Sequence, residues 1–197
     1  MVALVFSALA AVGGTAGSAD AWQIDASHSS ASFSVSHMVV GTARGRIGGI
    51  AGTVTFSPKN ITKAKVDVTL DAKTVNTDDE KRDAHLRSAD FFDVEKHPKI
   101  RFVSKAVKKA KGGKWDIVGD LTMRGVTKEV VLTGTVSDVV KSPWGKLVVA
   151  VSAATKINRH DFGVSWSKKL DAGGLVVGDE VTISLEIELN RAASSGS

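Results

Sequence analysis

The chain has 197 residues, which is enough for one domain with a sizeable core and too few for two comfortable ones. It contains no cysteine, which excludes disulfides, thiolate metal sites, a cysteine nucleophile and a lipid-modified cysteine. The formal net charge is +5, and one lysine-rich segment, residues 105–114, explains most of the excess. Gly112 and Gly113 mark a hairpin tip in that segment, and no aromatic residue interleaves with its lysines. We therefore interpret it as a solvated turn and expect no nucleic-acid partner.

The N-terminal residues 1–21 have the shape of a secretory signal peptide. An apolar stretch is followed by small residues and by an Ala19-Asp20-Ala21 pattern, so cleavage is expected just before Trp22. No lysine or arginine precedes the apolar stretch, so the leader lacks its usual basic start. The competing interpretation is a membrane anchor, which the glycines and small residues from Gly13 onward disfavour. The sequence therefore predicts a periplasmic or secreted protein.

Alternating patterns dominate the chain after Trp22. From Ala31 to Val39, apolar residues and His37 occupy one face, and serines occupy the other. A glycine-rich strand pair follows from Gly41 to Phe56, where glycine is typical of bends, bulges and barrel corners. Residues 66–71 alternate again and predict a half-buried strand.

One stretch in the middle of the chain contains its single convincing helical segment. Thr77 and Glu80 stand in capping-box spacing and predict a helix over about residues 78–88. This helix carries no strong apolar stripe, so we expect it to be short and to lie on a rim or a surface. Phe91 and Phe92 come next, and we interpret the whole segment as a cap whose two aromatic rings turn toward the interior of a barrel.

The rest of the chain has the pattern of strands joined mainly by short turns. The last of them, Val181 to Leu189, shows the cleanest alternation. Counting gives about eight strands without regular βα alternation, so we predict an all-β fold, either an antiparallel barrel or a sandwich. The domain is expected to span residues 22–191, with a disordered tail at residues 192–197.

Small residues raise the question of what such a barrel would hold. Eight strands make a barrel just wide enough either to fill itself with side chains or to hold one small ligand. Gly48, Gly49, Gly119 and Ala153 stand near large apolar residues. They could leave an elongated apolar cavity, or they could simply let the strands bend and pack. The composition of the chain is compatible with both interpretations.

Several long motifs resemble the YceI-like, polyisoprenoid-binding family. They cover nearly all of the chain after the leader, in the order Trp22–Met38, Asn76–Phe102, Gly119–Leu132, Ile157–Gly163 and Val177–Leu189. The resemblance implies a lipocalin-like antiparallel β-barrel with a short helical cap, exported from the cytoplasm. It also implies non-covalent binding of a long isoprenoid or another amphiphilic lipid inside the barrel, with no cofactor and no firmly attached catalytic activity.

The residues that we expect to line a lipid-binding cavity combine the inward strand positions with the aromatic residues of the cap and of the motif at residues 157–166. They are Phe33, Val35, His37, Ile47, Ile50, Phe91, Phe92, Phe102, Ile117, Leu121, Met123, Phe162, Trp166 and Ile183. Members of the family usually carry aromatic residues where this chain has Ile47 and Ile50, which leaves the preferred ligand open. His37 could bond a ligand head group, or it could be a histidine at a strand end bonded to backbone.

Asn158, Arg159 and Asp161 form the sharpest polar cluster in the sequence. They could receive a ligand head group at the mouth of the barrel. In the alternative, Asn158 and Asp161 tie the end of a strand to its turn, and Arg159 pairs with an acidic residue of the 78–83 run.

The sequence gives little support to catalysis or metal binding. The five histidines show no HxH, HxxxH or HxxEH spacing, so no metal site is expected. The sequence around Ser165, GVSWS, is not a nucleophile elbow, so the prediction is a binding protein and not an enzyme. Two alternatives stay open: an enzyme that acts on a bound lipid or quinone, and a packed, ligand-free barrel that acts as an interaction module. Transient membrane contact and a homodimer are both compatible with the sequence, which does not determine the oligomeric state.

Overall fold

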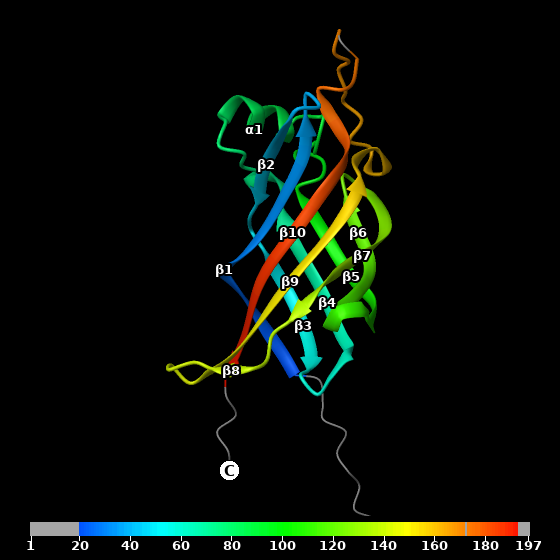
Figure 1. Cartoon of the computed structure of the whole chain (residues 1–197). Coiled ribbons are helices and arrows are strands. Elements are labelled where there is room, and N and C mark those ends of the chain that lie inside the picture. Colours follow the sequence, from blue (N-terminus) through cyan, green and yellow to red (C-terminus); the bar gives the residue numbers. More distant parts are fainter. Residues whose placement is uncertain (1–19, 172, 193–197) are drawn as a thin grey trace, which may run out of the picture.

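The computed structural model of the chain describes residues 20–171 and 173–192. The predicted leader therefore lies outside the described residues, apart from Asp20 and Ala21, which begin the first strand. The predicted tail also lies outside them, apart from Ala192, at which the last strand ends. Figure 1 shows an elongated barrel with one helix, α1, at the end that we call the upper end.

Within the described residues the fold has ten strands and one α-helix, with three short 3₁₀ turns between them. The first strands are β1 (Asp20–His37), β2 (Gly41–Ile47), β3 (Ala51–Ser57) and β4 (Asn60–Asp71). A 3₁₀ turn (Ala72–Thr74) and α1 (Glu80–Arg87) follow. The second half has β5 (Lys99–Lys109), a 3₁₀ turn (Lys111–Gly113), β6 (Trp115–Met123), β7 (Val126–Val136) and β8 (Val140–Lys141). It ends with β9 (Lys146–Asn158), a 3₁₀ turn (Arg159–Phe162) and β10 (Val177–Ala192).

Eight of the strands close into an antiparallel barrel, which confirms the predicted fold. The ring runs β10-β1-β3-β4-β5-β6-β7-β9, and the pairing of β9 with β10 closes it. Inward and outward residues alternate along each strand, as a barrel with an apolar interior requires. The remaining two strands lie beside this ring: β2 pairs with the upper part of β1, and β8 pairs with the start of β9.

The wall of the barrel is interrupted between β2 and β3. Gly49 adopts a φ of +67° at the interruption, and a Cβ atom there would lie 2.7 Å from the Cβ atom of Asp71. The Gly48 amide donates to the Thr74 hydroxyl at 2.7 Å, and its carbonyl accepts from the Asp71 amide at 3.0 Å. Above this point a single β-bridge, between Arg46 and Asn76, joins β2 to the segment that precedes α1. The glycine-rich sequence therefore marks a bend, as predicted, and the cap segment covers the seam above it.

The helix of the cap begins differently from the sequence prediction. Asp79 is its N-cap and accepts from the Arg82 amide at 2.9 Å, so Thr77 and Glu80 do not form a capping box. Thr77 instead donates through its hydroxyl and its amide to the buried carboxylate of Asp83, at 2.5 and 2.8 Å. The prediction failed because an acceptor closer to the helix was available, which left Thr77 free to bond the next turn.

Aromatic packing closes the lower end of the barrel. The ring of Trp22 stacks on Phe56 with the centroids 4.9 Å apart, and the indole N–H donates to the Phe56 carbonyl. Val54, Val149 and Leu189 are buried in the same cluster. We call these five residues the lower plug. Among the described residues, none of the helices has the length and apolar character needed to span a membrane.

Candidate ligand cavity

An elongated cavity of about 580 Å³ occupies the interior of the barrel. It reaches from Phe56 and Ile24 at the lower end to Trp166 and His37 at the upper end. This volume lies in the range of about 300–1,000 Å³ that is typical of small-molecule sites. The interior is therefore not filled by side chains, which argues against the alternative of a fully packed barrel.

Most of the cavity wall is apolar because it consists of the inward residues of successive strands. Every predicted cavity residue except Phe162 lies along the cavity: Phe33, Val35, His37, Ile47, Ile50, Phe91, Phe92, Phe102, Ile117, Leu121, Met123, Trp166 and Ile183. Ile47 and Ile50 stand on the two sides of the wall interruption, and both belong to this lining. These residues line the cavity, but that they bind a ligand stays a prediction.

Phe162 occupies a different place from the one expected. Its side chain is almost fully buried and packs in the hydrophobic core, but it does not border the main cavity. It borders a shallow depression outside the barrel together with Lys128 and Lys156. The 3₁₀ turn at residues 159–162 explains this placement, because it carries the ring away from the inward positions of β9.

Sequence reasoning missed much of the lower half of the cavity and most of its small lining residues, although it had singled out Ala153. Ile24, Ile61, Val136, Val151 and Ile187 line the lower half. The small inward residues Ala31, Ala43, Ala153 and Thr155 make room for the cavity along its length. Alternation was the available signal for these positions, but it does not show which strand ends reach the same depth in a barrel.

Polar side chains meet the cavity mainly at its upper end. Thr77, Lys81, Arg82 and His85 of the cap segment line it there, together with His37 at the end of β1. We call these five residues the upper rim. The only cavity-lining residues that are exposed belong to this rim, which shows that the cavity reaches the surface of the described chain at its upper end.

His85 packs against the aromatic residues at the upper end of the cavity. Its ring lies edge-on to Phe91 with the centroids 5.0 Å apart, and edge-on to Trp166 at 5.2 Å. A ring nitrogen of His85 also lies 2.9 Å from a carboxylate oxygen of Asp90. The cap therefore places a histidine against two aromatic residues that line the cavity.

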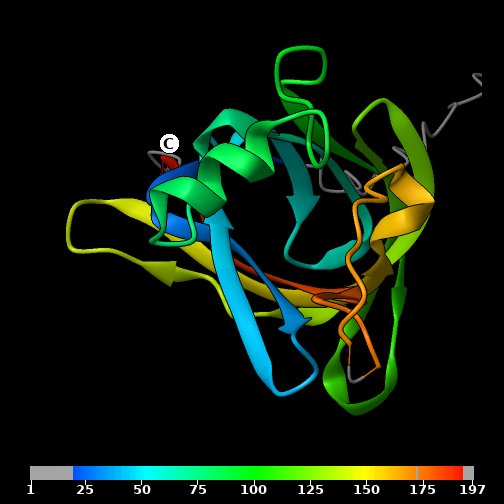
Figure 2. The same cartoon turned by 90° about the horizontal axis from the view of Figure 1, so that it is seen from above.

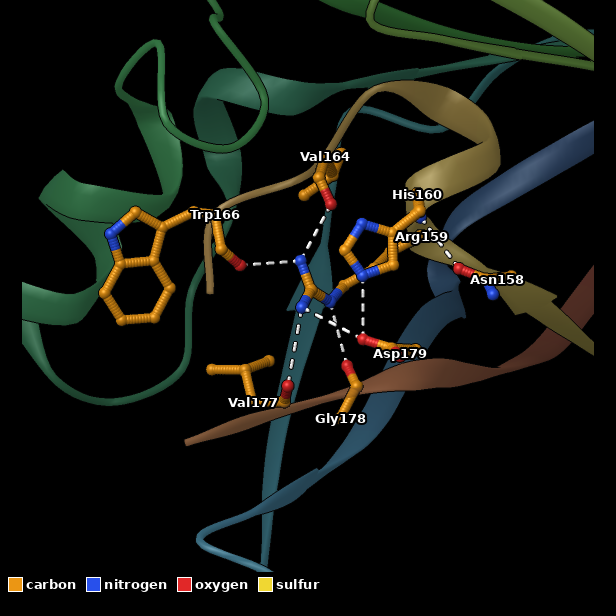
Figure 3. A network of polar contacts seen from close by, with 8 residues as sticks. All are labelled: Asn158, Arg159, His160, Val164, Trp166, Val177, Gly178 and Asp179. Carbon is orange, nitrogen blue, oxygen red and sulfur yellow. Dashed lines mark hydrogen bonds and ion pairs between the residues drawn. The ribbon is translucent and has the colours of Figure 1, made fainter. Parts of the chain in front are cut away.

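Arg159 is the centre of a buried polar network, which Figure 3 shows from close by. Its guanidinium donates to the carbonyls of Gly178, Val164 and Trp166 at 2.7–2.8 Å. One terminal nitrogen also lies 3.3 Å from the carboxylate of Asp179. Burial lowers the pKa of the Arg159 guanidinium, and the nearby Asp179 carboxylate opposes that shift. The arginine therefore ties the loop after β9 to the start of β10.

This network corrects the predicted partner of Arg159, which is Asp179 and not an acidic residue of the 78–83 run. Asn158 caps the 3₁₀ turn by accepting from the His160 amide at 2.9 Å. Asp161 is exposed and borders the outer depression. Of the three residues proposed to receive a head group, Arg159 alone borders the main cavity, and neither Asn158 nor Asp161 does.

One cluster in the described part of the chain has three side chains close enough to hold a metal ion, namely Asp25, His28 and Glu188. It lies on the outside of the barrel, where β1 bulges against β10 between Asp25 and Ser30. Nδ1 of His28 lies 3.2 Å from Asp25 and 3.8 Å from Glu188, so an ion pair accounts for the cluster. The Ser27 hydroxyl and then His28 hold the pKa of Asp25 at about 2, and Asp25 in turn raises the pKa of His28.

A His28→Ala substitution is expected to lower the melting temperature slightly near pH 5.5 and to leave it unchanged near pH 9. The raised pKa of His28 means that its ion pairs stabilise the fold below about pH 6.5 and are lost as the pH rises through the folded-state value. Melting curves of both proteins at the two pH values measure this effect. An equal difference at both values would show that packing, and not charge, accounts for the role of His28.

The fold and the cavity together define a class of protein: a small antiparallel barrel that encloses one elongated apolar cavity under a helical cap. Comparison with known proteins agrees with this description. A family model described as the YceI-like domain matches residues 22–189. The chain is 36% identical over 188 residues to Protein YceI of Escherichia coli O157:H7, covering 94% of this chain and 95% of that protein. The chain therefore belongs to the YceI-like family.

Solved structures show the same fold. The crystal structure of Burkholderia cenocepacia BcnA superimposes with a TM-score of 0.73 at 24% identity, covering 84% of this chain and 98% of BcnA. A domain from Saccharophagus degradans, described as a polyisoprenoid binding domain, gives a TM-score of 0.59 at 15% identity. It is matched over 85% of this chain and 97% of that domain. At these identities the likeness establishes the architecture alone.

Proposed function

We propose that the protein binds one long-chain isoprenoid, or a related amphiphilic lipid, non-covalently inside the barrel. The observation that carries this proposal is the elongated cavity of about 580 Å³, with an apolar wall along its length and charged side chains at one end. Membership of the YceI-like family supports the proposal, as does the polyisoprenoid-binding description of the structural neighbour from Saccharophagus degradans.

The energetics of such a ligand explain why it needs an enclosed cavity. Each buried methylene contributes about 0.8 kcal/mol, so one five-carbon isoprene unit contributes roughly 3–4 kcal/mol. A chain of several units therefore stays in a membrane unless a comparable apolar environment is offered to it. A closed barrel offers one because its backbone hydrogen bonds are made between its own strands, which leaves no unsatisfied polar groups in the wall.

The distribution of polar groups supports one orientation of the ligand. The apolar tail extends toward the lower plug, where the Trp22 and Phe56 rings close the barrel. The head group stays at the upper rim, near Lys81, Arg82 and His85, where a polar group keeps contact with water or with a charged side chain. In this orientation the ligand enters and leaves through the upper end.

We further propose that the protein stores or carries this lipid outside the cytoplasm. The leader pattern of residues 1–21 supports export. Catalysis is not part of the proposal. The cavity-lining histidines lie at the upper rim, and the wall below it is mainly apolar.

Native mass spectrometry and organic-solvent extraction of the purified protein test the proposed function. One lipid molecule per chain is expected, either co-purified or taken up from added polyprenyl lipid. The bound lipid is expected to remain chemically unchanged on prolonged incubation. A protein that carries no lipid and takes up none would overturn the proposal, and a ligand that is converted with time would show that the barrel is an enzyme.

A further inference from the structure

Two loop tips project beyond the barrel at the upper end. One is the turn between β1 and β2, and the other is the loop that precedes β10, as Figures 1 and 2 show. The first tip carries three consecutive apolar residues, Met38, Val39 and Val40, which are 46%, 67% and 94% exposed. Three consecutive apolar side chains with such exposure are unusual on the surface of a globular protein.

The conformation of the first tip is strained. Met38 and Val39 have φ values of +51° and +66°. A β-branched residue such as valine rarely adopts this region, and strain of this kind persists where the surrounding structure holds it. Contacts with the second tip provide that support. The Met38 amide donates to the Val176 carbonyl at 2.9 Å, and a Cβ atom added at Gly174 would lie 2.7 Å from Val39.

Positive charge accompanies these apolar residues. Lys168 and Lys169 are exposed in the second tip, and Arg44 is exposed on β2 just below the first tip. Within the described residues, none of these three cations takes part in an ion pair. Asp171 is the acidic residue of the same loop, so the two tips carry a net positive charge. A surface that combines exposed apolar side chains with cations suits an anionic lipid bilayer.

We propose that the Met38–Val40 tip, together with Lys168 and Lys169, docks the protein on an anionic membrane surface. We call these five residues the docking surface. The valine side chains enter the boundary between head groups and acyl chains, and the lysines contact the anionic head groups. Docking in this orientation turns the upper rim, and with it the exposed end of the cavity, toward the bilayer. The adjoining residues support this geometry, because His37 precedes the tip and lines the cavity.

The opposite end of the barrel provides a matched control. Val140 of β8 is 61% exposed and, like Val40, does not line the cavity. A Val→Asp substitution at either position adds the same charge to an exposed tip. Only the change at Val40 alters the proposed docking surface.

Vesicle flotation tests the proposal with phosphatidylcholine vesicles and with mixed phosphatidylcholine and phosphatidylglycerol vesicles at low salt. The wild-type protein is expected to float with the mixed vesicles and to be released by high salt. Val40→Asp and the double substitution Lys168→Glu, Lys169→Glu are each expected to weaken this binding by about tenfold. Val140→Asp is expected to bind like the wild type. Melting curves establish that all variants are folded.

Wild-type protein that floats with neither vesicle would overturn the proposal, and the tips would then suit a protein partner instead. Equal losses for Val40→Asp and Val140→Asp would also overturn it. The docking proposal and the proposed function can fail separately. Val40→Asp is expected to take up lipid normally from detergent solution and slowly from vesicles, whereas failure of lipid binding would abolish uptake from both sources in every variant.

Discussion

Replacing Ala153 by phenylalanine is expected to abolish uptake of a long-chain lipid. Ala153 belongs to β9, pairs with Leu185 of β10, and borders the cavity with its methyl group. A phenyl ring at this position occupies the path of the lipid chain. Each isoprene unit excluded from the cavity loses roughly 3–4 kcal/mol of favourable burial, so exclusion of one unit already weakens binding more than a hundredfold. Native mass spectrometry after incubation with polyprenyl lipid measures the bound fraction.

The neighbouring residue supplies the control for this substitution. Ala154 follows Ala153 on the same strand, but its side chain is exposed on the outside of the barrel. Ala154→Phe adds the same volume without entering the cavity, so its uptake is expected to match that of the wild type. Equal uptake by a folded Ala153→Phe variant would mean that the ligand does not occupy this part of the cavity.

Replacing Arg159 by methionine is expected to lower the free energy of unfolding by about 3–5 kcal/mol. Arg159 is only 3% exposed, and its guanidinium donates hydrogen bonds to carbonyls of both the loop and β10. Methionine matches much of its length but leaves the carbonyls of Gly178, Val164 and Trp166 without this donor. For a domain of this size the loss corresponds to a fall in melting temperature of roughly 6–20 °C. Urea unfolding monitored by tryptophan fluorescence measures it.

Two further variants identify the cause of that loss. Arg159→Lys is expected to recover only part of the stability, because one ammonium group does not reproduce the planar set of donors. Asp161→Asn changes an exposed neighbour and is expected to stay within about 0.5 kcal/mol of the wild type. An Arg159→Met variant as stable as Asp161→Asn would show that the network adds nothing to the net stability.

The barrel was predictable because its strands are amphipathic and adjacent in sequence. Along β10, Val181 to Leu189 alternate in both sequence and structure, and the same residues that are apolar line the cavity. The bend at Gly49 could also be anticipated, because only the conformational freedom of glycine suits a positive φ in close contact with Asp71. Local rules were sufficient for these features.

The missed features depend on contacts between distant segments. Asp179 is twenty residues from Arg159, and nothing in the sequence distinguishes it as the partner of the arginine from the acidic residues of the 78–83 run. The lower plug joins Trp22 to Phe56, which are thirty-four residues apart, and neither residue carries a local sign of that contact. The ion pairs of His28 arise from a bulge in β1, whose register no alternating pattern reports. All three contacts form only when strands of the barrel come together, so local sequence patterns do not predict them.

The pairing of β1 with β10 has a consequence for the order of folding. The Glu188 amide donates to the Ser29 hydroxyl across 159 residues of sequence, so one edge of β1 finds its partner only when β10 is present. Contacts of such sequence separation slow folding to milliseconds or seconds. Synthesis of the intervening chain takes longer, on the order of ten to thirty seconds at about 5–20 residues per second. Throughout that time one edge of β1 is open to pairing with other chains, and a chaperone that holds this edge would protect the unfinished barrel.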